Sequence, residues 1–274
     1  MNLHLTFLEG DARQFAVDRS HEEWNASRPY DAHCRFWQEL LATPCGRKRW
    51  RIPAMVGDAG EPVASMALFD LAFVLEGRKI RVGGIASFAV LKNLRKSGIG
   101  KRFMDEIHAL LKNEGYDAAL LFSAIDPAYY ERLGYKAFST PLMEASLGAL
   151  KDAPRCGAGS FSGASALACA PMADEGVCPT ATIRPYAEED FPAVRELYNL
   201  QMASQRLALL RDDDYWEMDA LRSRLTEEWF AKRTHPWTFL VADRDGQVCA
   251  YLRSGFSDKD GALIIAEYGF EAGA

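Results

Sequence analysis

The sequence predicts an α/β fold with a mixed sheet, and three features of the first half of the chain carry this prediction. An apolar run rich in β-branched and aromatic residues, 84–90, predicts a buried strand. A loop with two glycines and a helix of clear apolar period follow it. A second apolar run, 117–122, predicts another strand, and a helix that crosses between two strands predicts that they are parallel.

The loop and the helix between these strands form a candidate anion site. Apolar residues recur at helical spacing from Ile99 to Leu111, and Gly115 is suited to end the helix. The loop therefore places its N–H groups at a helix N-terminus, where the helix dipole favours an anion such as pyrophosphate. A Gly-x-Gly in this position is also compatible with a plain tight turn. Basic side chains surround the loop: Arg95, Lys96, Lys101 and Arg102.

Further elements are predicted on both sides of this unit. Residues 65–74 have the composition of a strand. Asp126 and Pro127 are a helix start signal for a short helix that reaches Leu133. Gly134 stops that helix, and a short strand is expected over 134–138.

Two segments, in this order and spacing, resemble the acetyl-CoA-binding core of the GNAT acyltransferases. They are Arg95-x-x-Gly98-x-Gly100 and, about thirty residues later, the run from Tyr129 to Tyr135. The resemblance covers roughly residues 60–138. It implies the GNAT acyl-CoA N-acyltransferase fold, with acetyl-CoA as cosubstrate.

The resemblance also implies roles for individual residues. In that family the strand that corresponds to residues 87–90 separates from its neighbour and pairs with the pantetheine arm, so Phe88, Ala89 and Val90 are carried over. Tyr130 matches the tyrosine that protonates the departing CoA thiolate. The loop from Lys96 to Lys101 would hold the pyrophosphate through main-chain N–H groups. The cofactor-binding residues of this region are Arg95, Lys96, Ser97, Gly98, Ile99, Gly100 and Lys101.

The residue types suit this chemistry. A phenol with an ordinary pKa of about 10 is protonated at neutral pH and can donate to a leaving thiolate. Tyr129 is the nearest alternative to Tyr130 as the acid, and Tyr130 can also be a tyrosine that simply packs on the sheet. The base that would neutralise the attacking amine stays open between four candidates: Asp70, Glu76, Asp126 and His108.

The region before the first predicted strand is expected to shape the acceptor pocket. Aromatic side chains and carboxylates cluster there, and such groups bind amines. Trp24, Trp37 and Asp70 are the candidate substrate-binding residues. Aromatic residues on early helices often belong to a core, and a core position is the favoured interpretation for Trp37.

Composition limits the remaining possibilities. The chain has 274 residues, 49% hydrophobic and 26% charged, with a formal net charge of -6. An acidic protein argues against nucleic acid as the main partner. No apolar run approaches the roughly 20 residues of a membrane helix, and residues 1–8 lack the basic start of a secretory signal. We therefore expect a cytoplasmic enzyme without a membrane partner.

The cysteines predict neither a metal site nor a disulfide framework. They are scattered without a Cys-x-x-Cys pair, so reduced structural thiols are expected. The six are Cys34, Cys45, Cys156, Cys169, Cys178 and Cys249.

Three parts are predicted along the chain: a catalytic domain over 1–146, a linker rich in small residues over 147–182, and a second domain over 183–274. The segment from Ile183 to Phe191 resembles the opening of another GNAT domain, and helices, a hairpin at 238–252 and a last strand follow. No second Arg-x-x-Gly-x-Gly is present. The second domain is therefore a partial GNAT-like unit, either a supporting half or the visible part of a longer protein.

A catalytic GNAT domain followed by one without a phosphate loop resembles the tandem Eis-like acetyltransferases. The predicted function is acetyl transfer from acetyl-CoA to a primary amine of a small molecule, aminoglycoside-like or another polyamine, or of a protein lysine. The alternative is a non-catalytic acyl-CoA-binding or regulatory module of GNAT origin. Acyl-chain length stays open, and a homo-oligomer is a further expectation.

Overall fold

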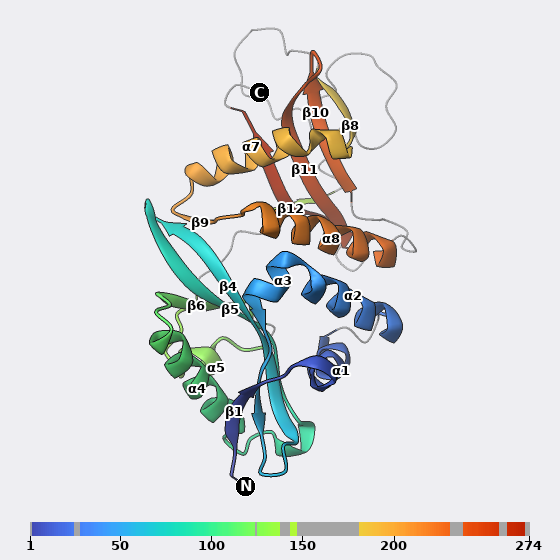
Figure 1. Ribbon diagram of the computed structural model, residues 1–274. Helices are drawn as coiled ribbons and strands as arrows, with labels where there is room; N and C mark the ends of the chain where they lie inside the picture. Colours follow the sequence, from blue (N-terminus) through green and yellow to red (C-terminus); the bar gives the residue numbers. More distant parts are fainter. Residues whose placement is uncertain are drawn as a thin grey trace. The chain divides into compact units, whose positions relative to one another are not determined.

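The structure is a computed structural model that describes residues 2–24, 28–123, 125–137, 143–146, 181–230, 238–257 and 262–271. Apart from residues 181 and 182, the predicted linker 147–182 lies outside the described residues. The chain forms two compact units (Figure 1). Unit 1 comprises Met1–Ser139 with Arg206–Trp229, and unit 2 comprises Thr140–Gln205 with Phe230–Ala274.

Unit 1 is built on a seven-stranded mixed sheet. Its main path runs β1-β3-β4-β5-β6, and β2 and β9 also pair with β4. All of these pairs are antiparallel except β5 with β6, which are parallel, so the predicted parallel pair and the mixed-sheet class are confirmed. The strands are β1 (His4–Phe7), β2 (Trp50–Arg51), β3 (Pro53–Val56), β4 (Pro62–Leu75), β5 (Arg78–Val90), β6 (Ala118–Leu121) and β9 (Leu207–Leu209).

Helices cover both faces of this sheet (Figure 1). On one face, which we call the α1 face, a core cluster includes Val17, Trp37 and Met218. On the other, the α4 face, a second cluster includes Ile85, Phe103 and Ile107. The first face carries η1 (Gly10–Arg13), α1 (Gln14–Trp24), α2 (Tyr30–Ala42), α3 (Pro44–Arg49) and α8 (Asp213–Phe230); the second carries α4 (Ile99–Asn113) and α5 (Ala128–Glu131).

Helix α4 confirms the predicted crossover helix. Four apolar side chains at helical spacing are buried along it: Phe103, Met104, Ile107 and Leu111. Gly83 of β5 lets this helix approach closely, because a Cβ at that position would lie 2.7 Å from Leu111 Cδ2. The predicted strand at 134–138 is not formed over Tyr135–Ala137, and Phe138 lies outside the described residues.

Strand β5 pairs differently on its two sides. Its pairing with β4 shifts register at a bulge, since Ser65 faces Ala89 but Ala67 faces Ala86. The pairing with β6 runs from Val82 to Ile85, and no further pair with β6 follows in the described part of the chain. The last five residues of β5 therefore have an edge that β6 does not cover.

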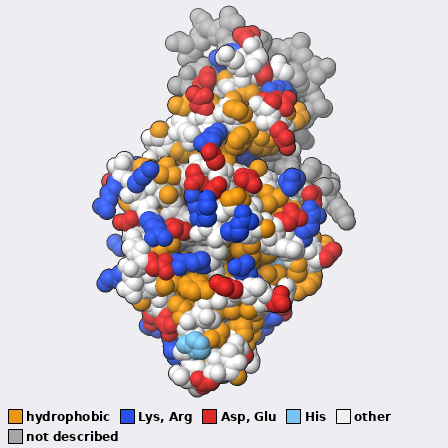
Figure 2. All heavy atoms as spheres, in the orientation of Figure 1, with side chains coloured by type: hydrophobic (Ala, Val, Ile, Leu, Met, Phe, Trp, Pro, Cys, Tyr) orange, Lys and Arg blue, Asp and Glu red, His pale blue; other side chains and the backbone are white. Residues whose placement is uncertain are grey.

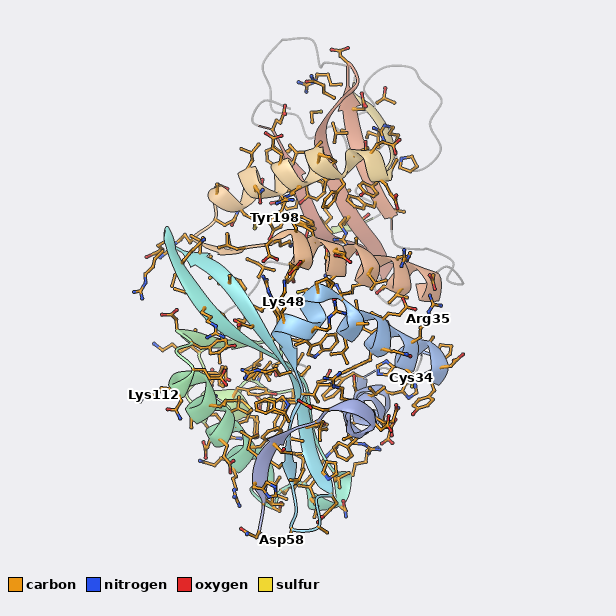
Figure 3. All side chains as sticks on the ribbon, viewed as in Figure 1. Cys34, Arg35, Lys48, Asp58, Lys112 and Tyr198 are labelled. Carbon is orange, nitrogen blue, oxygen red and sulfur yellow. The ribbon has the colours of Figure 1, made fainter. Side chains whose placement is uncertain are left out.

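A segment from late in the chain completes unit 1. Strand β9 pairs with the far half of β4, and Met218 of α8 lies in the core of the α1 face. Lys48 and Arg35, labelled in Figure 3, lie on α3 and α2 and form ion pairs with Asp214 and Glu228 of α8 at 2.5 and 3.1 Å. The predicted second domain, 183–274, thus contributes to both compact units.

Unit 2 contains a five-stranded sheet in the order β7-β12-β11-β10-β8 with α7 (Phe191–Ala203) packed on it. The predicted hairpin is confirmed, with Asp245 and Gly246 at φ 54° and 82° in its two-residue turn. Arg184 makes a bidentate ion pair, 2.7 Å per bond, with the buried Asp190. The strands are β7 (Met143–Ser146), β8 (Thr182–Pro185), β10 (Thr238–Arg244), β11 (Gln247–Ser257) and β12 (Ala262–Phe270), and η4 (Glu188–Asp190) precedes α7.

The contribution of α8 to unit 1 can be tested at Met218. Met218→Ala removes a side chain that is buried in the α1-face core, so the free energy of unfolding of unit 1 should fall by about 2–3 kcal/mol. Hydrogen exchange of peptides from β4 and α4 measures this. Glu217→Ala, at an exposed position on the same helix, is the control and should change little. Unchanged exchange in Met218→Ala would contradict the placement of α8 in this core.

Stability should also depend on pH through His33 of α2, which is 1% exposed. Burial, with the charges of Arg28 and His21, lowers the pKa of His33 from 6.5 to about 4. The folded state then holds neutral His33 while the unfolded state takes up a proton, so stability is complete above pH 6.5 and falls from there to pH 4, by on the order of 3 kcal/mol.

Urea unfolding at pH 7 and pH 4.5 measures this loss. His33→Gln should flatten the dependence in this pH range, and His4→Gln, an exposed histidine of β1, should leave it as in the wild type. If all three proteins lose the same free energy of unfolding between pH 7 and pH 4.5, His33 does not cause the pH dependence.

Candidate functional site

The glycine loop before α4 has the geometry of a helix N-terminal anion site. Gly98 is the N-cap residue, with φ 87°, and Lys96 also has a positive φ, 64°. The hydroxyl of Ser97 donates to the carbonyl of Leu94 at 2.6 Å and so closes the turn that starts in η2 (Lys92–Leu94). The N–H groups of the first turn of α4 have no carbonyl of their own helix to bind. The loop therefore presents amide donors at the positive end of a 15-residue helix.

The cations around this loop are mostly paired with carboxylates. Lys101 pairs with Asp105 at 2.6 Å, and Arg95 pairs with Glu23 at the end of α1. Arg95 also donates to the carbonyl of Val90 at 3.2 Å. Lys96 is exposed and has no ion pair among the described residues. Figure 2 shows the same mixture across the visible face, where basic and acidic side chains lie beside one another.

The uncovered edge of β5 leads directly to this loop. The amide of Leu91 donates to Val63 at 2.9 Å, so the alternation of an antiparallel pair turns the backbone groups of Ala89 toward β4. Those of Phe88 and Val90 then face the edge that β6 leaves open. The three side chains carried over from the sequence pack inward or lie half-buried, and Ala89 is 4% exposed. Recognition at this edge would thus use the main chain.

Two neighbouring tyrosines lie on α5. Tyr130 packs against the second core, and its ring meets those of Tyr129 and Tyr135 at centroid distances of 5.0 and 5.8 Å. Burial, and next the neighbouring Tyr129, raises the pKa of Tyr130. Tyr129 lies against the loop, because a Cβ on Gly100 would be 3.0 Å from the Tyr129 hydroxyl. The Tyr129 hydroxyl thus lies beside the loop, and the raised pKa of Tyr130 keeps its phenol protonated at neutral pH.

Asp70, a candidate base and substrate ligand, lies on the α4 face. It faces Gly83 across the strand pair, on the side that packs against Leu111. Arg81 binds both of its oxygens, at 2.9 and 2.6 Å. Burial raises the pKa of Asp70, the Arg81 hydrogen bonds lower it, and the net pKa is below its usual value. The contacts of Asp70 are those of a structural ion pair.

The other three base candidates also have partners. Glu76 lies in the β4–β5 turn and pairs with Arg206. Asp126 accepts the amide of Ala128 at 2.9 Å and so starts α5. His108 lies 2.9 Å from the hydroxyl of Tyr135, and burial lowers its pKa. Each of these side chains thus has a structural contact that explains its position, and none of the contacts requires it to act as a base.

The two tryptophans predicted to bind substrate lie in different environments. Trp37 is 3% exposed and packs against Trp50 with 4.9 Å between ring centroids, which is a core position. Trp24 is 45% exposed at the end of α1, one residue after Glu23. Of the two, Trp24 keeps a surface that a ligand can contact.

Sequence reasoning did not single out two contacts that the fold makes with α1. Glu23 reaches Arg95 of the loop, and the hydroxyl of Ser20 lies 3.4 Å from that of Ser87 in the β5 bulge. The residues concerned are 72 and 67 positions apart. Nothing in the local sequence pattern indicates either pairing.

Within the described residues, no helix combines the length and the apolar character needed to cross a membrane. Described cysteines Cys34, Cys45 and Cys249 are free thiols, while Cys156, Cys169 and Cys178 lie outside the described residues.

Comparison with known proteins finds a family similar to the region that contains the glycine loop. Residues 46–138 match the family model of the acetyltransferase (GNAT) domain. No curated protein matches the chain. Residues 46–138 are therefore similar to a GNAT acetyltransferase domain.

Solved structures share the fold over nearly the whole chain. A probable N-acyltransferase of Enterococcus faecalis matches at 14% identity and a TM-score of 0.67, over 100% of this chain and 59% of that one. A GCN5-related N-acetyltransferase of Anabaena variabilis matches at 12% identity and a TM-score of 0.67, over 99% of this chain and 60% of that one. The N-myristoyltransferase of Saccharomyces cerevisiae, with bound myristoyl-CoA, matches at 14% identity and a TM-score of 0.56, over 98% of this chain and 66% of that one. This chain thus spans about three fifths to two thirds of the length of these structures.

The Glu23–Arg95 ion pair yields a prediction for anion binding. Glu23→Gln removes the carboxylate that neutralises Arg95, so acetyl-CoA should bind several-fold more tightly at low salt, since an exposed charge pair is worth up to about 1 kcal/mol. Calorimetric titration at 20 mM and 300 mM NaCl measures the affinity. Glu39→Gln, which breaks a carboxylate pair with Arg35 on α2, is the control and should leave the affinity unchanged. Unchanged affinity in Glu23→Gln at both salt concentrations would contradict this role.

Proposed function

We propose that this protein is an acyl-CoA-dependent N-acyltransferase that moves an acetyl group from acetyl-CoA to a primary amine, of a polyamine or aminoglycoside-like molecule or of a protein lysine. The observation that carries the proposal is the continuity between the uncovered edge of β5 and the glycine loop at the start of α4. One substrate with an amide-bearing arm and a pyrophosphate fits both parts. The match of residues 46–138 to the GNAT domain supports the same class of reaction.

The residues present suit such a substrate. The N–H groups of Phe88 and Val90 would pair with the amides of the pantetheine arm as a neighbouring strand does. The loop from Lys96 to Lys101 would bind the pyrophosphate through its main chain, and Lys96 would add a charge. Gly100 has no side chain to occupy the narrow space in front of Tyr129.

Tyr130 would act as general acid in this reaction. The amine nitrogen forms a bond to the thioester carbonyl carbon, the carbon–sulfur bond breaks, and the phenol gives its proton to the departing sulfur. A raised pKa keeps this proton in place at neutral pH. The positive amine formed on attack gives up a proton to water in this proposal, because all four candidate bases are engaged in other contacts: Asp70, Glu76, Asp126 and His108.

We also propose that unit 1 alone binds acyl-CoA, in an Eis-like tandem arrangement. Unit 2 has its own sheet and helix, and the sequence contains no second Arg-x-x-Gly-x-Gly. The match of the Enterococcus faecalis structure over 100% of this chain supports a common two-part architecture.

Replacement of the phenol tests the proposed reaction. Tyr130→Phe removes the acid and should lower kcat by about 10²-fold, with the affinity for acetyl-CoA nearly unchanged. Release of free CoA thiol in the presence of an amine measures the rate. Tyr129→Phe, the adjacent phenol, is the control and should retain most of the activity.

The pH profile adds a second readout. Because burial raises the pKa of Tyr130, wild-type kcat should persist to above pH 10, where an ordinary tyrosine is half ionised. A non-catalytic acyl-CoA-binding module is the alternative function. Binding of acetyl-CoA without amine acetylation, and full function of Tyr130→Phe in any regulatory assay, would favour that alternative.

A further inference from the structure

Ser87 has an unusual backbone for its place in the fold. Its φ is 50°, in the left-handed region that residues with a side chain rarely adopt. Two other such residues, Glu76 and Asp245, lie in the two-residue turns of hairpins, where a positive φ is expected. Ser87 lies inside β5, at the bulge. Strain of this kind within a strand is found mainly at functional sites.

The bulge turns two consecutive side chains, those of Ala86 and Ser87, to the α1 face, because the residues on either side of them both pack on the α4 face. Ile85 and Phe88 both pack toward α4, since Ile85 lies in the second core and Phe88 contacts Phe103 at 5.9 Å between ring centroids. Between them, Ala86 is exposed and Ser87 contacts Ser20 of α1. A regular strand alternates its side chains, so the extra residue is required for this arrangement. It occurs directly after the last β5–β6 pair, Ile85 with Leu121.

An acceptor can reach this point of β5 from one side only. On the α4 face the space is filled by Ile85, Phe103 and Ile107, which are 5%, 0% and 0% exposed. On the α1 face Ala86 is exposed and Ser87 is half-buried. An amine that attacks a thioester held at the β5 edge would therefore approach past Ala86 and Ser87.

We infer that the Ser87 hydroxyl binds the attacking nitrogen of the acceptor, an inference that rests on the proposed function. The hydroxyl oxygen accepts a hydrogen bond from the amine, which leaves the nitrogen lone pair directed to the thioester carbonyl. Ser20, 2% exposed and 3.4 Å away, is a positioning residue that holds this hydroxyl on the α1 face.

Ser87→Gly separates this role from a structural one. Glycine adopts a positive φ readily, so the melting temperature should rise by about 2–4 °C. The lost hydrogen bond should lower kcat/KM for the amine by about tenfold, while the Kd for acetyl-CoA stays unchanged. Ser87→Ala should lose the same activity without the gain in stability. Asp245→Gly, at a positive-φ position in a hairpin turn of unit 2, should leave kcat/KM unchanged.

Ser20→Ala tests the positioning role. It should lower kcat/KM several-fold in the wild-type background and have no further effect in Ser87→Ala, because its contribution passes through the Ser87 hydroxyl. Equal effects in both backgrounds would assign Ser20 to packing alone.

The assays use acetyl-CoA with three amines: spermidine, kanamycin and a lysine peptide with a blocked N-terminus. A tenfold loss of kcat/KM in Ser87→Gly at unchanged acetyl-CoA affinity supports the inference. Full activity in both Ser87 variants, or weakened acetyl-CoA binding in both, overturns it. If the wild type binds acetyl-CoA and acetylates none of the three amines, the proposed acceptor class fails and the inference falls with it; if it binds no acetyl-CoA, the proposed function itself has failed.

Discussion

The unequal pairing of β5 is the constraint on which the site depends. Along one side β5 bonds to β4 over nearly its full length, whereas on the other side it pairs with β6 only from Val82 to Ile85. Unpaired backbone amides at the end of a strand bind another extended chain or remain in contact with water. Because β5 runs on through a short loop into α4, the same edge leads to the amides of a helix N-terminus. One pairing difference thus aligns two kinds of main-chain donor.

Helix α1 connects the two ends of this site. Ser20 contacts the bulge and Glu23 contacts Arg95 of the loop, and one turn of helix separates them. A rigid helix fixes the distance between these contacts, so the region expected to receive the acceptor and the region expected to hold the phosphates are mechanically linked. The tightly packed α4 face, with Phe103 and Ile107 fully buried, leaves the α1 face as the accessible one.

Unit 1 requires chain segments that are far apart. Strand β9 extends the sheet beside β4, and Met218 of α8 enters the same core as Trp37. The residues that match the GNAT domain, 46–138, contain neither of these elements. The intervening chain belongs to unit 2, so the backbone leaves unit 1 and returns to it.

The sequence by itself determined the elements that depend on near neighbours. Apolar periodicity predicted α4 and β6, glycines located the loop at Gly98, and a crossover helix implied the parallel pair, because each of these features is set by local sterics and hydrogen bonding. Only the tertiary structure decided the bulge at Ser87, the pairing of Arg95 with Glu23, the position of Asp70 on the α4 face and the place of α8 in unit 1. These depend on contacts between residues distant in sequence, for which a single chain's local pattern carries no signal.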